Sequence, residues 1–175
     1  MSDLITDEYK QLNQQLHEDR PEYGAHNAHR WVQAVNDLTW EYETFDVLDY
    51  GCGKGALSRL MSKMHIKNYD PGVPAYATPP NSADIVVCTD VMEHIEPECL
   101  EAVIKDLKRV TRKALLINIS LQHAHKTLAD GRNAHLIVED IDFWCTALLP
   151  HFELQSIQGT NGVEVTMILL AREVH

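Results

Sequence analysis

Hydrophobic residues in the first part of the chain recur at the three- and four-residue spacing of amphipathic helices. One such face carries Ile5, Tyr9, Leu12 and Leu16, and a second carries Ala28, Trp31, Val35 and Leu38. A proline and a glycine within residues 20–24 separate the two patterns. The sequence therefore predicts two helices within residues 1–44.

From residue 45 onward, short apolar runs typical of strands alternate with segments of helical periodicity. We expect strands at 45–50, 66–69, 84–88 and 114–119, and helices at 54–64, 97–110 and 139–149. The first of these helices should point Leu57, Leu60, Met61 and Met64 inward. We also expect a terminal hairpin, with strands at 151–158 and 163–171 and a turn at 159–162. Alternating strands and helices imply an α/β fold with a mostly parallel sheet.

Three glycines follow the first predicted strand at every second position, in the stretch Asp49-Tyr50-Gly51-Cys52-Gly53-Lys54-Gly55. Glycine permits positive φ and close approach of a ligand to the main chain, and a helix that begins there offers unpaired N–H groups. We therefore expect a nucleotide-type cofactor above this loop. The order differs from the G-x-G-x-x-G pattern of dinucleotide sites, so an NAD-linked oxidoreductase is a weaker alternative. A tight turn without a ligand is the structural alternative.

Two further segments carry polar groups at the ends of predicted strands. Asp70 lies 21 residues beyond Asp49, close to the offset at which a ribose-binding acid follows a glycine loop, although Asp70-Pro71-Gly72 is also a common turn. The apolar run that starts at Ala83 suits a buried central strand and leads into Thr89-Asp90-Val91-Met92-Glu93-His94.

Together, residues 46–95 resemble the class I S-adenosylmethionine (SAM)-dependent methyltransferases, which carry an E/D-x-G-x-G-x-G loop beside the methionine half of the cofactor and a Glu-His pair after the fourth strand. The length of 175 residues suits a single domain over residues 1–175. The resemblance implies a three-layer Rossmann-like fold for it, with N-terminal helices at 1–44 and a core at 45–175. It also implies SAM as the cofactor. The implied cofactor-binding residues are Asp49, Gly51, Cys52, Gly53, Gly55, Asp70, Pro71, Thr89, Asp90 and Val91.

The resemblance places His94 near the methyl-bearing sulfur, where a neutral imidazole can act as a base. His135 belongs to a polar loop after the strand expected at 114–119, at the edge where open α/β sheets bind ligands. We predict His94 and His135 as catalytic residues in methyl transfer to oxygen or nitrogen of a small-molecule acceptor. Alternatively, His94 only bonds a carbonyl and the loop histidines are solvated. A SAM-binding protein without transferase activity, serving as a regulatory or partner subunit, is the functional alternative.

A second functional alternative is a metal-assisted O-methyltransferase. Some class I O-methyltransferases, acting on small-RNA 3′ ends or quinone precursors, hold a divalent metal over the acceptor hydroxyls with an acid-x-x-Glu-His loop and a later histidine. Asp90, Glu93 and His94 are similar in residue type, with His135, His123 or His125 as the later histidine. Such a site would suit a vicinal-hydroxyl acceptor such as an RNA end or a catechol. The same Glu-His pair occurs in metal-free relatives, so our main prediction includes no metal.

The resemblance is incomplete on the adenine side of the cofactor. Only 13 residues, four of them proline, separate Asp70 from Asp84, so we expect a shortened third-strand region without the usual acceptor for the adenine amino group. Pro71 and Val73 would then form an apolar wall. By the same resemblance, Tyr23, Gly24 and Trp31 would cover the cofactor as a lid.

The amino-acid composition narrows the class of molecules that the protein is expected to bind. The 26 acidic and 15 basic residues give a net charge of −11, which argues against a broad nucleic-acid surface. The one basic cluster, at 105–113, suits the C-terminal end of a helix better than an RNA-binding site.

The sequence also bears on the location of the protein. Residues 1–20 do not look like a signal peptide, and no apolar run is long enough to span a bilayer. The four cysteines are scattered, as is usual for reduced thiols. We expect a cytoplasmic protein, with an open pocket that would allow a homodimer.

Overall fold

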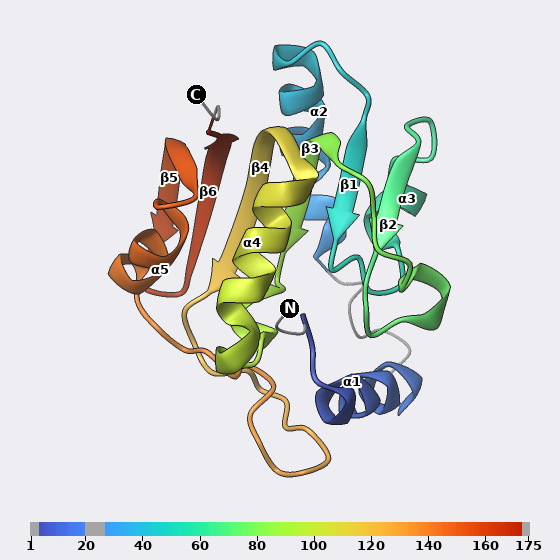
Figure 1. Ribbon diagram of the computed structural model, residues 1–175, viewed down its shortest axis with the longest axis vertical. Coiled ribbons are helices and arrows are strands. Elements are labelled where there is room, and N and C mark those ends of the chain that lie inside the picture. Colours follow the sequence, from blue (N-terminus) through green and yellow to red (C-terminus); the bar gives the residue numbers. More distant parts are fainter. Residues whose placement is uncertain (1–3, 20–26, 173–175) are drawn as a thin grey trace.

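A mixed six-stranded sheet organises the molecule (Figure 1). The computed structural model describes residues 4–19 and 27–172. In spatial order the strands are β2 (Ile66–Tyr69), β1 (Val47–Tyr50), β3 (Ala83–Thr89), β4 (Thr111–Ser120), β6 (Glu164–Ala171) and β5 (Phe152–Thr160). Strands β2, β1, β3 and β4 are parallel, whereas β6 runs antiparallel to both of its neighbours. The predicted mostly parallel sheet with an antiparallel C-terminal hairpin is confirmed.

Helices cover both faces of the sheet and produce three layers (Figure 1). The helices are α2 (Val32–Glu41) and α3 (Ala56–Leu60) on one face, and α4 (Leu100–Val110) and α5 (Ile141–Leu148) on the other. Because successive strand residues point to opposite faces, Leu115 packs toward α4 and α5 while Leu116 packs toward α2 and α3. Burying each such side chain stabilises the fold by roughly 2 kcal/mol.

Helix α1 (Asp7–Asp19) lies outside these layers, at the carboxyl ends of the parallel strands (Figure 1). Its buried residues Tyr9 and Leu16 pack against Leu128 and Ala134 of the long loop between β4 and α5. Both helices predicted within residues 1–44 are therefore present, with α2 preceded by a short 3-10 turn, η1 (Ala28–Arg30). No helix among residues 4–19 and 27–172 combines the length and apolarity needed to cross a bilayer.

The helix expected at 54–64 is shorter than predicted. Gly55, at φ +68°, is not yet helical, and Met61 leaves the helix with φ −104° and ψ 43°. In so short a helix Leu60 lies on the outer side with 56% of its surface exposed, so its predicted inward orientation is wrong. Leu57 and Met61 are buried as expected.

Other elements differ from the prediction by a few residues at their ends. The helix expected at 139–149 spans Ile141–Leu148, because Asp140 serves as its N-cap and accepts a hydrogen bond from the Phe143 N–H at 2.9 Å. The strand expected at 114–119 begins at Thr111, which pairs with Ala83 of β3.

The segment between β2 and β3 contains no strand, only the 3-10 turn η2 (Pro74–Tyr76). The predicted shortening of the third-strand region is thus confirmed in the described structure. Pro74 opens η2, and prolines cannot donate to a sheet ladder, which explains why this segment forms a turn. The Tyr76 carbonyl accepts a hydrogen bond from Asp70 N–H at 3.1 Å and closes the segment back onto the end of β2.

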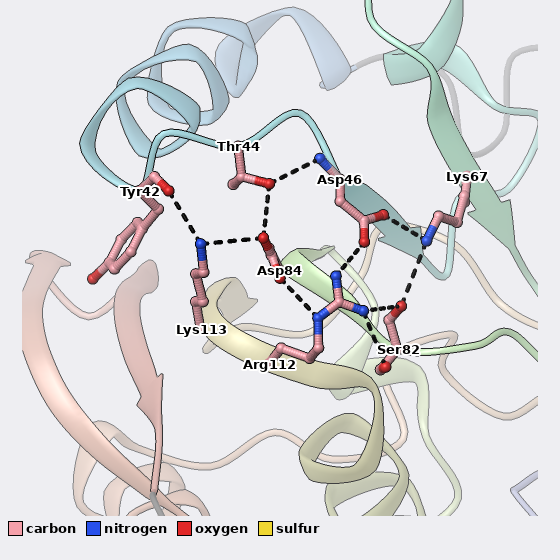
Figure 2. A network of polar contacts seen from close by, with 8 residues as sticks. All are labelled: Tyr42, Thr44, Asp46, Lys67, Ser82, Asp84, Arg112 and Lys113. Atoms are coloured by element: carbon pink, nitrogen blue, oxygen red, sulfur yellow. Dashed lines mark hydrogen bonds and ion pairs between the residues drawn. The ribbon is translucent and has the colours of Figure 1, made fainter.

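At the amino ends of the strands, a polar network joins β1, β3 and β4 (Figure 2). The Arg112 guanidinium bonds the carboxylates of Asp46 and Asp84 and the carbonyl of Ser82. Lys67 pairs with Asp46 at 2.5 Å, and Lys113 pairs with Asp84 at 3.2 Å. Two more members of the predicted basic cluster, Lys105 and Arg109, pair with acids of α4 itself. These pairings favour a structural role for the cluster over an RNA-binding one.

The glycine loop is held close to the segment that follows β3. Gly51 has a φ of +77°, and a Cβ placed on it would lie 2.3 Å from the Val91 Cγ2 atom. Gly131, in the loop after β4, also has a positive φ, of +89°, but a Cβ there would meet no atom within 4 Å. Close packing, in addition to backbone conformation, therefore requires glycine at position 51.

Replacing Arg112 with alanine should lower the free energy of unfolding by roughly 1 kcal/mol, a modest amount because the network is partly exposed and screened by solvent. Urea unfolding at low and high salt measures the effect, which should shrink at high salt. Lys108→Ala, at an exposed position of α4, is the matched control and should change little. Equal effects of the two substitutions would contradict the structural role of the network.

Gly51→Ala should lower the free energy of unfolding by roughly 3 kcal/mol, because it adds a clash with Val91 to the strain of a positive φ. Gly131→Ala carries the conformational strain alone and should lower it by about 1 kcal/mol. Denaturant unfolding compares the two. A Gly51→Ala/Val91→Ala double variant should recover part of the loss, and no recovery would mean that Val91 is not the obstacle.

Candidate functional site

A cavity of about 530 Å³ opens at the carboxyl ends of the parallel strands, between the glycine loop, the segment after β3, α1 and the loop after β4. Most of the predicted site residues line it: Asp49, Gly51, Cys52, Gly53, Asp70, Pro71, Thr89, Asp90, Val91, Glu93, His94 and His135. Gly55 does not line the cavity and instead precedes α3. Residues 40 or more positions apart in the sequence thus line one cavity.

Main-chain N–H groups shape the end of the cavity beside the glycine loop. The Tyr69 carbonyl accepts from the N–H groups of Gly51 and Cys52, at 2.7 and 3.1 Å. The Asp70 carboxylate accepts from Gly53 N–H at 2.9 Å and from Gly72 N–H at 2.8 Å, so it fixes both the glycine loop and its own turn. A carboxylate has about four acceptor positions, and Asp70 can therefore also receive hydroxyl groups of a ligand.

Asp49 is an almost fully buried carboxyl group on this side of the cavity. Burial, with the nearby negative charge of Asp70 as a second cause, raises the pKa of Asp49 to about 7. Within the part of the chain that the structure describes, no hydrogen bond or ion pair reaches its carboxylate. A ligand that brings a positive charge to Asp49 would favour its ionised form.

Glu93 occupies the corresponding place in the other half of the cavity. Its side chain is completely buried, and its Oε1 atom accepts from Ser120 N–H at 3.0 Å. The Oε2 atom receives no hydrogen bond from any described residue. Burial raises the pKa of Glu93 to about 8. The Glu93 carbonyl accepts from Leu136 N–H and Ile137 N–H, which anchors the loop after β4 to this residue.

Two histidine rings face each other beside Glu93. The centroids of His94 and His135 lie 4.7 Å apart, with the rings nearly perpendicular. His94 Nδ1 lies 2.7 Å from the Ala134 carbonyl oxygen, and His135 Nδ1 lies 2.5 Å from that of Gln122. Because a carbonyl only accepts, both Nδ1 atoms donate, and a neutral ring then carries its lone pair on Nε2. Burial lowers the pKa of His135, which favours its neutral form.

Asn133 holds His135 in this orientation, a role that the sequence did not suggest. Its side chain accepts from Ala124 N–H at 3.0 Å and from His135 N–H at 2.9 Å, and it donates to the Ala124 carbonyl at 2.8 Å. The preceding Asp130-Gly131-Arg132 forms the turn that its composition predicts. In the sequence, the only indication of this role is that Asn133 lies between that turn and His135.

Glu93, His94 and His135 each place one ligand atom within 4.8 Å of the others, so they can share a metal ion. Asp90, the fourth residue in the metal alternative, is not part of this group. It adopts a φ of +55°, and its carboxylate accepts from the Asn27 side chain at 3.0 Å. His123 and His125 also lie outside the group and are exposed.

Helix α1 and η1 form the outer wall of the cavity. The Glu96 carboxylate accepts from the N–H and the hydroxyl of Thr6, at 2.9 and 2.7 Å, and so secures the start of α1. Trp31 is buried in the core cluster that contains Val35 and Leu38 and also lines the cavity, so the structure is compatible both with a covering role and with plain core filling. The other two residues predicted for a lid, Tyr23 and Gly24, lie outside the described residues.

Comparisons with known proteins identify the family. Residues 16–159 match the family model described as "Methyltransferase domain". No curated protein matches the sequence. Among solved structures, the 1,6-didemethyltoxoflavin-N1-methyltransferase of Burkholderia thailandensis, with bound 1,6-didemethyltoxoflavin and S-adenosylhomocysteine, aligns with a TM-score of 0.68 and 15% identity over 99% of this chain and 93% of that one. Magnesium protoporphyrin IX methyltransferase from Synechocystis PCC 6803, with bound SAM, aligns with a TM-score of 0.66 and 15% identity over 98% and 100% of the two chains.

At such low identity these likenesses bear on the fold, and they confirm the predicted Rossmann-like architecture. Both structures contain SAM or its demethylated product, in agreement with the predicted cofactor. The family match extends well beyond half of the chain. The chain therefore belongs to the methyltransferase domain family and is built as a class I SAM-dependent methyltransferase.

Proposed function

We propose that this protein transfers a methyl group from SAM to an oxygen or nitrogen atom of a small-molecule acceptor bound in the same cavity. The observation that carries the proposal is the continuity of the cavity. The glycine loop and two carboxylates line one half, and the paired histidines line the other. Bringing donor and acceptor together in near-attack contact is the main requirement for methyl transfer.

The half beside the glycine loop fits SAM. The absence of side chains at Gly51 and Gly53 leaves main chain exposed to the cavity, where a ligand can approach closely. Asp49 offers a buried carboxyl group that the positively charged methionine part of SAM would hold ionised, and Asp70 offers acceptor positions for ribose hydroxyls. SAM, when bound, supplies an electrophilic methyl group on a sulfonium.

The adenine of SAM was expected to lie against an apolar wall of Pro71 and Val73, and the structure supports only part of that expectation. Pro71 lines the cavity as predicted, whereas Val73 does not. Asn13 of α1 lines it instead, and its side-chain nitrogen lies close to the Asp70–Gly72 turn. An amide side chain can both donate and accept, so Asn13 is our candidate for the adenine contact that the shortened third-strand region lacks.

The other half fits an acceptor that must lose a proton. The acceptor's lone pair forms the new bond to the methyl carbon, and the electrons of the carbon–sulfur bond remain on sulfur. The acceptor's proton can pass to Nε2 of His94 or His135, because Nδ1 of each ring already donates to a carbonyl. The limited volume favours a small molecule over a macromolecule.

The first experiment is calorimetric titration with SAM, followed by transfer of labelled methyl from SAM to the low-molecular-weight fraction of a cell extract. We expect SAM binding, and transfer that falls at least tenfold in His94→Ala and His135→Ala with little change in SAM affinity. His65→Ala, at an exposed position between α3 and β2, is the control. Binding without transfer to any fraction would mean a SAM-binding protein without transferase activity. Absence of binding would overturn the proposal.

Asp49→Asn should have opposite effects on stability and on SAM affinity. The pKa of Asp49 is raised to about 7 in the folded protein, so the ligand-free wild type loses stability as pH rises from about 4 to 7, as the unfolded chain ionises first. The variant should therefore unfold at a higher temperature at pH 8, with a gain of roughly 2 kcal/mol. It should also bind SAM about tenfold more weakly and lose the pH dependence of binding around pH 7.

Melting curves and SAM titrations from pH 5 to pH 8 measure both effects. Asp142→Asn, at an exposed position in the first turn of α5, serves as the control and should change neither quantity appreciably. A variant that binds SAM as tightly as the wild type at pH 8 would remove Asp49 from the proposed cofactor site.

A further inference from the structure

We infer that the methyl acceptor is an amine that carries a positive charge in solution, and that Glu93, with Asp90 and Glu164 beside it, binds its ammonium group. This acceptor class rests on the proposed function, because it specifies the molecule that receives the methyl group. It follows from the charge of the cavity wall, from a buried oxygen of Glu93 without a partner, and from the histidine nitrogens close to that residue.

Acidic side chains outnumber basic ones around the cavity. The described residues that line it include six acids and two bases, namely Asp49, Asp70, Asp90, Glu93, Glu96 and Glu164, and Arg30 and Lys126. Asp49 and Asp70 belong to the half proposed for SAM, and the Glu96 carboxylate is bonded to Thr6. The other three acids remain for the acceptor.

These three acids are neighbours. Asp90 and Glu93 belong to the segment after β3, and Glu164 begins β6, where it pairs with Ser120 of β4. Ser120 N–H in turn donates to Glu93 Oε1. Burial is the main cause of the raised pKa of Glu93, and the negative charges of Asp90 and Glu164 add to it. The Arg30 guanidinium pairs with Glu164 and compensates for one charge, so the group favours a cation.

Glu93 offers a hydrogen-bond acceptor to such a cation. Its exposed fraction is zero although it lines the cavity, and its Oε2 atom receives no hydrogen bond from any described residue. A buried oxygen without a hydrogen bond is destabilising. An ammonium N–H would satisfy this atom and would hold the carboxyl group in its ionised form.

The same place suits removal of a proton from the bound amine. One oxygen of Glu93 and one ring nitrogen each of His94 and His135 lie within 4.8 Å of one another. An ammonium bonded to Glu93 can therefore pass one proton to Nε2 of a neighbouring ring and become a neutral amine. The nitrogen lone pair then forms the bond to the methyl carbon, and the electrons of the carbon–sulfur bond remain on sulfur.

The movement of charge in this reaction distinguishes an amine from an oxygen anion. When a neutral amine takes a methyl group from a sulfonium, the positive charge passes from sulfur to nitrogen, and nearby carboxylates stabilise it there. An alkoxide, phenolate or carboxylate acceptor would instead bring a negative charge close to three acids, which is unfavourable. The charge of the wall therefore favours an amine.

Separating the acceptors by charge before the reaction tests this class. The low-molecular-weight fraction of a cell extract is divided on a cation-exchange column at pH 7, and each part is offered to the protein with labelled SAM. We expect methyl transfer to amines of the retained, cationic part. Transfer confined to the unretained part would overturn the amine acceptor and leave the proposed function intact.

Glu93→Gln keeps the shape of the side chain and removes its charge. It should raise the KM for the retained acceptors at least about tenfold, because a hydrogen bond between charged groups is lost, and it should leave SAM affinity nearly unchanged. Glu164→Gln, at a partly exposed position, is less of a risk to the fold and should raise the KM about threefold. Glu98→Gln, an exposed acid outside the cavity, is the matched control. An unchanged KM in Glu93→Gln would overturn the role of this residue.

Simple probes test the cation site without turnover. Benzylamine, which is protonated at pH 7, is compared with benzyl alcohol and benzoate by ligand-observed NMR on protein saturated with S-adenosylhomocysteine. Benzylamine should bind at least about tenfold more tightly than the alcohol, should lose this advantage in Glu93→Gln, and should keep it in Glu98→Gln. Equal or tighter binding of the alcohol or of benzoate would overturn the inference. If neither SAM nor S-adenosylhomocysteine binds, the proposed function fails, and the same probes on the ligand-free protein decide whether the cation site stands.

Discussion

A carboxylate removed from water is stabilised by a positively charged partner. One end of this sheet provides such partners for its carboxylates, and the other end does not. At the amino ends of the strands, hydrogen bonds from Arg112 and lysines outweigh the effect of burial and hold the pKa of Asp46 and Asp84 below its usual value (Figure 2). At the carboxyl ends, burial dominates and the pKa values of Asp49 and Glu93 are raised. At the amino ends of the strands, arginine and lysine side chains provide the positive charge beside the carboxylates. At the carboxyl ends, a positively charged ligand would provide it.

The same strands therefore carry stabilising ion pairs at their amino ends and the candidate site at their carboxyl ends. Asp46 and Asp49 are three residues apart at opposite ends of β1, and Asp84 and Glu93 lie at the start of β3 and beyond its end. Between them the strands bury side chains on both faces, and that core tolerates the unfavourable burial of two carboxyl groups. Improving the stability of the open end, by neutralising either acid, would remove the electrostatic feature that favours a ligand there.

The sequence predicted what depends on local pattern. The order of strands and helices, the hairpin and the glycine loop follow from periodicity and from residue types with specific backbone preferences. The position of Leu60 was wrong because the extent of α3 is set by non-local packing and by the backbone of Gly55 and Met61. The pairing of His94 with His135 could only be suggested, because it depends on where a 20-residue loop returns. Asn133 and Glu96 were missed because their partners, Ala124 and Thr6, are not adjacent in any sequence pattern.

The shortened third-strand region has a structural consequence for the whole cavity. Without a strand beyond β2, the sheet itself offers little wall on that side, and α1 takes this position. Asn13 of α1 approaches the Asp70–Gly72 turn, while Tyr9 packs with Leu128 of the loop that carries His135. One helix therefore contacts both the cofactor side and the acceptor side. Because the Glu96 carboxylate holds the start of α1 through Thr6, this contact also supports the part of the cavity wall that α1 forms.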